Sequence, residues 1–204
     1  MKLSTRFFVL VSVFFLMPHV VFAQEIDDTP DEEFIPTYTL GDQLLSIDLG
    51  IVIPLFFALG DDGIASTQLS VGGAGALYWG AFLTNEIAVG LDVAGSFMFT
   101  PNRRTLFLLP IAARASYFFR RYPFEFPVHL GLGLSISRLE EATKVDFIAK
   151  PGASVYWNYN AEWAFGLNAE YWFVPQIYIG DSPPSADSRI GNFLSVTLSA
   201  LYRF

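Results

Sequence analysis

From residue 44 to the end of the chain, apolar and polar residues alternate with a period of two. In residues 126–137, every second position holds phenylalanine, valine, leucine or isoleucine, and mostly small or polar residues stand between them. A β-strand turns successive side chains to opposite faces, so this pattern predicts strands with one apolar and one polar face. Eight such segments follow one another, and a closed single-chain barrel needs an even number. We therefore predict an all-β fold, an eight-stranded antiparallel up-and-down transmembrane β-barrel over residues 44–204.

Two kinds of connection separate the predicted strands. Three are short and cover residues 83–85, 119–122 and 158–161. Four are mostly longer and more polar and cover residues 58–66, 100–104, 139–145 and 175–190. Outer-membrane barrels have short periplasmic turns and longer surface loops. The asymmetry therefore predicts that both termini lie in the periplasm.

The first 23 residues have the features of a secretory signal peptide. Lys2 and Arg6 precede an apolar run at residues 7–16, and Val21 and Ala23 precede a cleavage point before Gln24. The alternative is a membrane anchor. A spanning helix needs about 20 apolar residues, and this run is shorter. We therefore predict that residues 1–23 are removed and that the chain is exported to the outer membrane.

Residues 24–43 differ from the barrel segment in composition. They carry seven acidic residues and no basic residue, and Pro30 and Pro36 interrupt them. Such a composition favours disorder over packing. We expect a flexible periplasmic leader outside the barrel, with a specific acidic docking site as the alternative.

Composition supports a membrane barrel and excludes several functions. Of the 204 residues, 52% are hydrophobic and 16% charged, against about 25% charged in soluble domains. Without Lys2 and Arg6, ten of the 12 basic residues remain against all 20 acidic ones, a net charge of −10. Such a chain is a poor nucleic-acid partner. Cysteine is absent, and no Gly-x-Ser-x-Gly motif, phosphate loop or metal-spaced cluster occurs. We expect no catalytic residue, metal or cofactor, and no enzymatic activity.

A few charged residues fall on the predicted inner face. These are Asp48, Asp92, Arg114, His129, Lys150 and Glu170. Asp92 and Arg114 are about equally far along the chain from the turn near Asn102, and Lys150 and Glu170 are equally far from Asn160. We therefore expect each pair to meet across its hairpin. Paired charges avoid the cost of a lone buried charge. The favoured interpretation is a structural polar plug that fills a narrow lumen. The alternative is a polar gate or ion path.

Apolar residues take the inward positions near the predicted loop end. The candidate apolar vestibule comprises Val52, Phe56, Met98, Leu108, Ile148, Trp172 and Val174. Such a pocket above a polar plug suits a small hydrophobic ligand. The alternative is a β-bulge near Pro54 or Pro110, which would turn these residues to lipid.

The chain ends in Leu201, Tyr202, Arg203 and Phe204, an aromatic last residue preceded by alternate apolar residues. With the eight alternating segments, this resembles the small eight-stranded bacterial outer-membrane barrels of the OmpW, OmpX and OmpA-barrel types, most closely OmpW. The resemblance implies that Tyr202 and Phe204 form the signal recognised by the barrel-assembly machinery. It also implies outer-membrane lipid as a partner and small hydrophobic molecules as solutes. The alternative function is a structural or surface-interaction barrel with a sealed lumen and partner-binding loops. A soluble lipocalin-type barrel is disfavoured because the outward faces are too apolar.

Overall fold

The computed structural model describes residues 37–59, 63–102, 104–139, 142–175 and 189–204, all within the compact unit that spans residues 33–204. The predicted signal peptide and residues 24–36 of the predicted leader lie outside the described residues. The described strands are β1 (Gln43–Leu59), β2 (Ile64–Ala65), β3 (Gly72–Phe82), β4 (Ile87–Phe99), β5 (Thr105–Arg121), β6 (Phe124–Leu139), β7 (Ala142–Asn158), β8 (Trp163–Pro175) and β9 (Arg189–Arg203). In this part of the chain, no helix is long and apolar enough to cross a membrane.

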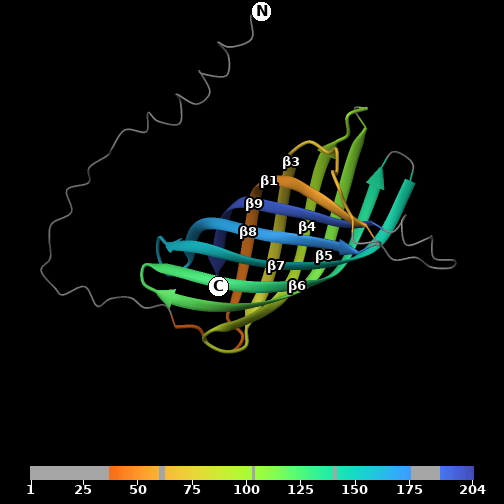
Figure 1. Cartoon of the computed structure of the whole chain (residues 1–204). Helices are drawn as coiled ribbons and strands as arrows, with labels where there is room; N and C mark the ends of the chain where they lie inside the picture. The colour runs from red at the N-terminus through yellow and green to blue at the C-terminus, as the bar shows by residue number, and fades with distance from the viewer. Residues whose placement is uncertain (1–36, 60–62, 103, 140–141, 176–188) are drawn as a thin grey trace, which may run out of the picture. The chain divides into compact units, whose positions relative to one another are not determined.

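Antiparallel pairing closes the sheet into a barrel (Figure 1). Each long strand pairs with its neighbours in the chain, and β9 pairs back with β1 from Leu44 opposite Arg203 to Leu59 opposite Arg189. The two-residue β2 only extends the β1 edge. The predicted eight-stranded up-and-down barrel is therefore confirmed. Strands also extend into the predicted loop at residues 139–145, because β6 and β7 are separated by residues 140–141 alone.

Side-chain burial follows the predicted period of two. On β5, Phe107 and Leu109 are 51% and 42% exposed, whereas Leu108 between them is 4% exposed. The same alternation gives a continuous apolar exterior, on which Leu49 and Leu198 are 66% and 70% exposed. A closed barrel pairs its backbone N–H and C=O groups between strands, so its apolar exterior can face hydrocarbon.

An aromatic girdle surrounds the end of the barrel where β1 begins and β9 ends, which we call the terminal end. The Tyr202 ring is tilted against Trp163, with centroids 4.7 Å apart, and stacks on Phe204 at 5.8 Å. Trp157 and Tyr159 continue the girdle across β7. Aromatic side chains favour the interface between lipid and water, so this girdle is suited to one membrane boundary.

A β-bulge in β1 corrects the predicted inner face near the opposite end, which we call the loop end. The register with β9 shifts between Pro54 and Phe56, where proline supplies no backbone N–H to the ladder. Beyond the bulge, Phe57 packs against the buried apolar cluster in the lumen. The assignment of Phe56 to the vestibule is therefore wrong, because Phe57 takes that place. No such shift occurs at Pro110, which stays opposite Ser135.

Candidate functional site

The charged residues predicted for the lumen lie inside the barrel, and five of them form one network. We call this set, Asp92, Arg114, His129, Lys150 and Glu170, the charge network. The Lys150 Nζ atom lies 2.6 Å from Asp92 Oδ1 and 3.1 Å from Glu170 Oε2. Arg114 Nη1 lies 3.4 Å from Asp92 Oδ2 and 3.5 Å from Glu170 Oε1. Lys150 and Arg114 thus each contact both carboxylates. The contacts include the two expected hairpin pairs. The other two, Lys150 with Asp92 and Arg114 with Glu170, are the crossed contacts, and they join β4 and β5 to β7 and β8.

His129 and Trp172 complete the hydrogen bonding of the charge network. The His129 Nδ1 atom lies 3.0 Å from Arg114 Nη2, and a guanidinium can only donate, so Nδ1 accepts. The proton of the neutral ring then lies on Nε2, which is 3.1 Å from Glu170 Oε1. Trp172 Nε1 donates to Glu170 Oε2 at 3.0 Å. Glu170 is therefore the hub that connects the charge network to the apolar layer above it.

Asp48 lies inside the barrel but outside the charge network. Its carboxylate accepts hydrogen bonds from the hydroxyls of Ser46, at 2.8 Å, and Ser199. The Tyr156 hydroxyl lies 2.8 Å from Ser199 Oγ. No basic side chain of the described residues forms an ion pair with Asp48. This carboxylate is thus held by hydroxyl groups alone.

A second polar cluster closes the lumen at the terminal end, and we call it the terminal plug. Glu125 Oε2 accepts a hydrogen bond from Arg203 Nη2 at 2.7 Å, and Arg120 Nε lies 3.4 Å from Glu125 Oε1. The Tyr38 ring stacks on Phe82 at 4.1 Å, and its hydroxyl donates to Glu125 Oε1 at 3.1 Å. Burial raises the pKa of Tyr38 above its usual value, so the hydroxyl keeps its proton and donates.

The terminal plug is the part of the lumen that the sequence analysis missed. Tyr38 was assigned to a leader outside the barrel, yet it is only 8% exposed, and its N–H donates to Asn85 Oδ1. A turn with Gly41 in the left-handed region, at φ 99°, lies between Tyr38 and β1. Glu125 shares the inward parity of His129, so extending the alternation by two positions would have found it. The position of Tyr38 has no comparable signal.

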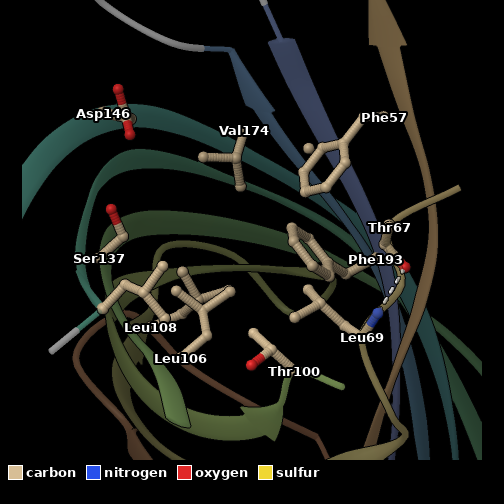
Figure 2. Close-up of a pocket in the computed structure, with 12 residues that line it drawn as sticks. Phe57, Thr67, Leu69, Thr100, Leu106, Leu108, Ser137, Asp146, Val174 and Phe193 are labelled. Atoms are coloured by element: carbon tan, nitrogen blue, oxygen red, sulfur yellow. Dashed lines mark hydrogen bonds between the residues drawn. The ribbon is translucent and has the colours of Figure 1, made fainter. Parts of the chain in front are cut away.

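An apolar pocket of about 320 Å³ lies in the lumen at the loop end (Figure 2). We call it the loop-end pocket. Its lining consists of Phe57, Thr67, Leu69, Thr100, Leu106, Leu108, Ser137, Leu139, Asp146, Val174, Gly191 and Phe193. Of the predicted vestibule, Leu108 and Val174 line the pocket itself. The buried apolar cluster that includes them also contains Val52, Met98, Ile148 and Trp172.

Trp172 marks the boundary between the loop-end pocket and the charge network. Its side chain is 1% exposed and packs in the apolar cluster. The Lys150 Nζ atom lies 5.3 Å from the centre of its ring, within the range of a cation–π contact. The lumen therefore changes along the barrel from a polar, hydrogen-bonded interior to an apolar cavity. Among the described residues, no cluster of histidine and carboxylate side chains could hold a metal ion.

A closed eight-stranded barrel with an apolar exterior and a filled polar lumen defines the class of small transmembrane β-barrels. A sequence profile of one protein family matches residues 25–202, and the chain belongs to that family. This chain is 29% identical over 178 residues to an uncharacterized protein of Borreliella burgdorferi. The match covers 76% of this chain and 80% of the relative. An uncharacterized protein of Treponema pallidum is 26% identical to this chain over 175 residues. The match covers 80% of this chain and 78% of the relative.

The solved structures give the same class by fold. Neisserial surface protein A matches with a TM-score of 0.53 and 14% identity, covering 79% of this chain and 97% of that protein. The fold is thus that of the small eight-stranded outer-membrane barrels, as predicted. The more specific OmpW type stays a prediction.

Proposed function

We propose that this protein is an integral outer-membrane barrel that binds small hydrophobic molecules in its loop-end pocket, as the first step of their admission. The observation that carries the proposal is the apolar cavity of about 320 Å³ above Trp172. Ligand pockets commonly have volumes of about 300–1,000 Å³ and mostly apolar walls with a few polar groups. The loop-end pocket is at the small end of this range, so it suits a compact molecule.

The rest of the proposal concerns export and assembly. Residues 1–23 act as a signal peptide, both termini lie in the periplasm, and Tyr202 and Phe204 are recognised by the barrel-assembly machinery. The apolar exterior supports this account because about half of the Leu49 and Leu198 surfaces or more would otherwise be in contact with water. The protein acts without catalysis, through binding alone.

A second candidate function is a structural or surface-interaction barrel whose loops bind partners. The observation that favours it is the filling of the lumen below the loop-end pocket. The charge network and the terminal plug occupy this region with buried, mutually bonded side chains. Passage along the barrel axis would require these contacts to break, whereas binding in the pocket would not.

Equilibrium binding to the reconstituted full chain separates the two functions. The ligands are radiolabelled para-butyltoluene, para-butylphenol and para-butylaniline, and binding is measured by dialysis against nanodiscs, with empty nanodiscs subtracted. The test variant is Val174→Trp, which fills the pocket from a position 6% exposed. The matched control is Phe173→Trp, the adjacent residue on the lipid face.

We expect saturable binding of at least one ligand, lost in Val174→Trp and retained in Phe173→Trp. Circular dichroism and electrophoretic mobility before and after heating show whether each variant is folded. A folded wild-type barrel that binds none of the three ligands above the empty nanodiscs would refute the binding function. The sealed structural barrel would then be the working account.

A further inference from the structure

β6 and β7 form the wall of the loop-end pocket that carries a carboxylate, and Thr67 and Thr100 add hydroxyl groups elsewhere in the lining. Asp146 and Ser137 lie on this side, and Phe57 and Phe193 lie across the pocket from them (Figure 2). Asp146 is 4% exposed, so its carboxylate is a buried group at the edge of an apolar cavity. The Lys144 Nζ atom lies 3.4 Å from Asp146 Oδ1, so the carboxylate is part of an ion pair.

The polar groups on this wall present acceptors to the cavity. The Ser137 hydroxyl donates to the Lys144 backbone carbonyl at 3.3 Å, so its oxygen lone pairs are the part that a ligand can use. An ionised carboxylate accepts hydrogen bonds only, at about four lone-pair sites, so Asp146 can accept from a ligand while it is paired with Lys144. The wall therefore matches a donor group.

Ser135 extends the polar wall beneath the pocket. It lies opposite Asp146 in the β6–β7 ladder and is fully buried. Within the described part of the chain, its hydroxyl has no hydrogen-bond partner. A buried hydroxyl without a partner is costly, so this side of the lumen is more polar than packing alone requires.

We infer that the ligand of the loop-end pocket is an amphipathic molecule, with a compact apolar body and a hydrogen-bond donor such as a phenol, alcohol or amine at one end. The inference rests on the proposed function and adds the chemical class of the ligand. The apolar body contacts Phe57, Phe193 and Leu108, and the donor binds the Asp146 carboxylate. A pure hydrocarbon offers no hydrogen bond to the acceptors of this wall, and an anionic head, which has acceptors only, offers none either.

The three para-butyl ligands test this inference because they share one body and differ in the head group. Para-butylphenol and para-butylaniline donate a hydrogen bond, whereas para-butyltoluene does not, and para-butylbenzoate adds the anionic case. We expect both donors to bind about tenfold or more tightly than para-butyltoluene, as for a hydrogen bond to a charged acceptor. Para-butylbenzoate should bind least.

Two variants assign the preference to Asp146. Asp146→Leu should abolish the difference between para-butylphenol and para-butyltoluene while the latter still binds, and Asp146→Asn should reduce the difference. If Asp146→Leu fails to fold, the isosteric Asp146→Asn decides alone. Equal binding of para-butyltoluene and para-butylphenol to the wild type overturns the inference and leaves the pocket function standing. Absence of saturable binding by all four ligands overturns the proposed function itself.

Discussion

Replacing Lys150 with methionine should destabilise the barrel strongly, although the two side chains have similar length. The Lys150 side chain is 1% exposed and contacts two carboxylates, at 2.6 Å and 3.1 Å. Because His129 is neutral, the two positive charges of Arg114 and Lys150 balance the two negative charges of Asp92 and Glu170. The variant would leave two buried carboxylates that share the single charge of Arg114.

The magnitude follows from opposing effects. At an effective dielectric constant of about 20, each Lys150 contact corresponds to roughly 5–6 kcal/mol of Coulomb attraction. Removing the ammonium group also removes its desolvation cost, which is several kcal/mol for a buried ion. Breaking a buried ion pair on one side typically costs about 3–5 kcal/mol, and we expect the free energy of unfolding of Lys150→Met to fall by that amount.

Urea titration of the barrel in lipid vesicles, followed by tryptophan fluorescence, measures this change once reversibility has been established. The double variant Lys150→Met with Asp92→Asn restores neutrality in the charge network. We expect it to recover about 2 kcal/mol or more of the loss, because residues in one network are coupled. A cost below about 1 kcal/mol for Lys150→Met, or a double variant whose cost equals the sum of the single costs, would refute the charge-balance reasoning.

Three further predictions test the terminal plug, the strand packing and the exterior. Tyr38→Phe should lose only the bond to Glu125, about 1.5–3 kcal/mol in the same titration. Tyr38→Ala also loses the stacked ring and should cost at least about 1 kcal/mol more than Tyr38→Phe, within the range of about 3–5 kcal/mol typical of buried aromatic truncations; equal costs would contradict the stacking role. Gly90→Ala should reduce folding yield because its Cβ would clash with the Trp79 carbonyl oxygen, whereas the Cβ of Gly95→Ala on the same strand meets nothing within 4 Å, so this variant should be tolerated. Leu132→Arg, on the apolar exterior, should cost about 2–4 kcal/mol in vesicles; a neutral effect would argue against a lipid-facing surface.

The fold was predictable from the sequence because it depends on local alternation. Each strand shows its two faces through the period of two, and the same pattern recurs eight times. The inward placement of Asp92 and Lys150 follows from this parity alone. The crossed contacts between Arg114 and Glu170 do not, since they depend on which non-neighbouring strands approach across the lumen.

The wrong predictions concern positions where the alternation of apolar and polar residues is interrupted or does not apply. At Pro54 the missing N–H allows a bulge, and one extra residue exchanges the faces of Phe56 and Phe57. A bulge near Pro54 was one predicted alternative, but the alternation of apolar and polar residues could not decide between a bulged and a regular strand. Tyr38 was missed for a different reason, because an acidic and proline-containing composition describes the average of a segment and not the burial of one ring.

The sequence by itself therefore determined the strand count, the apolar exterior and the inward placement of the charge network and Asp48, because these follow from side-chain direction along one strand. Only the tertiary structure decided that Glu170 contacts Arg114, Lys150, His129 and Trp172. It also decided how Tyr38 packs at the terminal end and where the loop-end pocket lies. Those features are made by residues far apart in the chain, whose distances are fixed by barrel closure and by the register of every ladder between them.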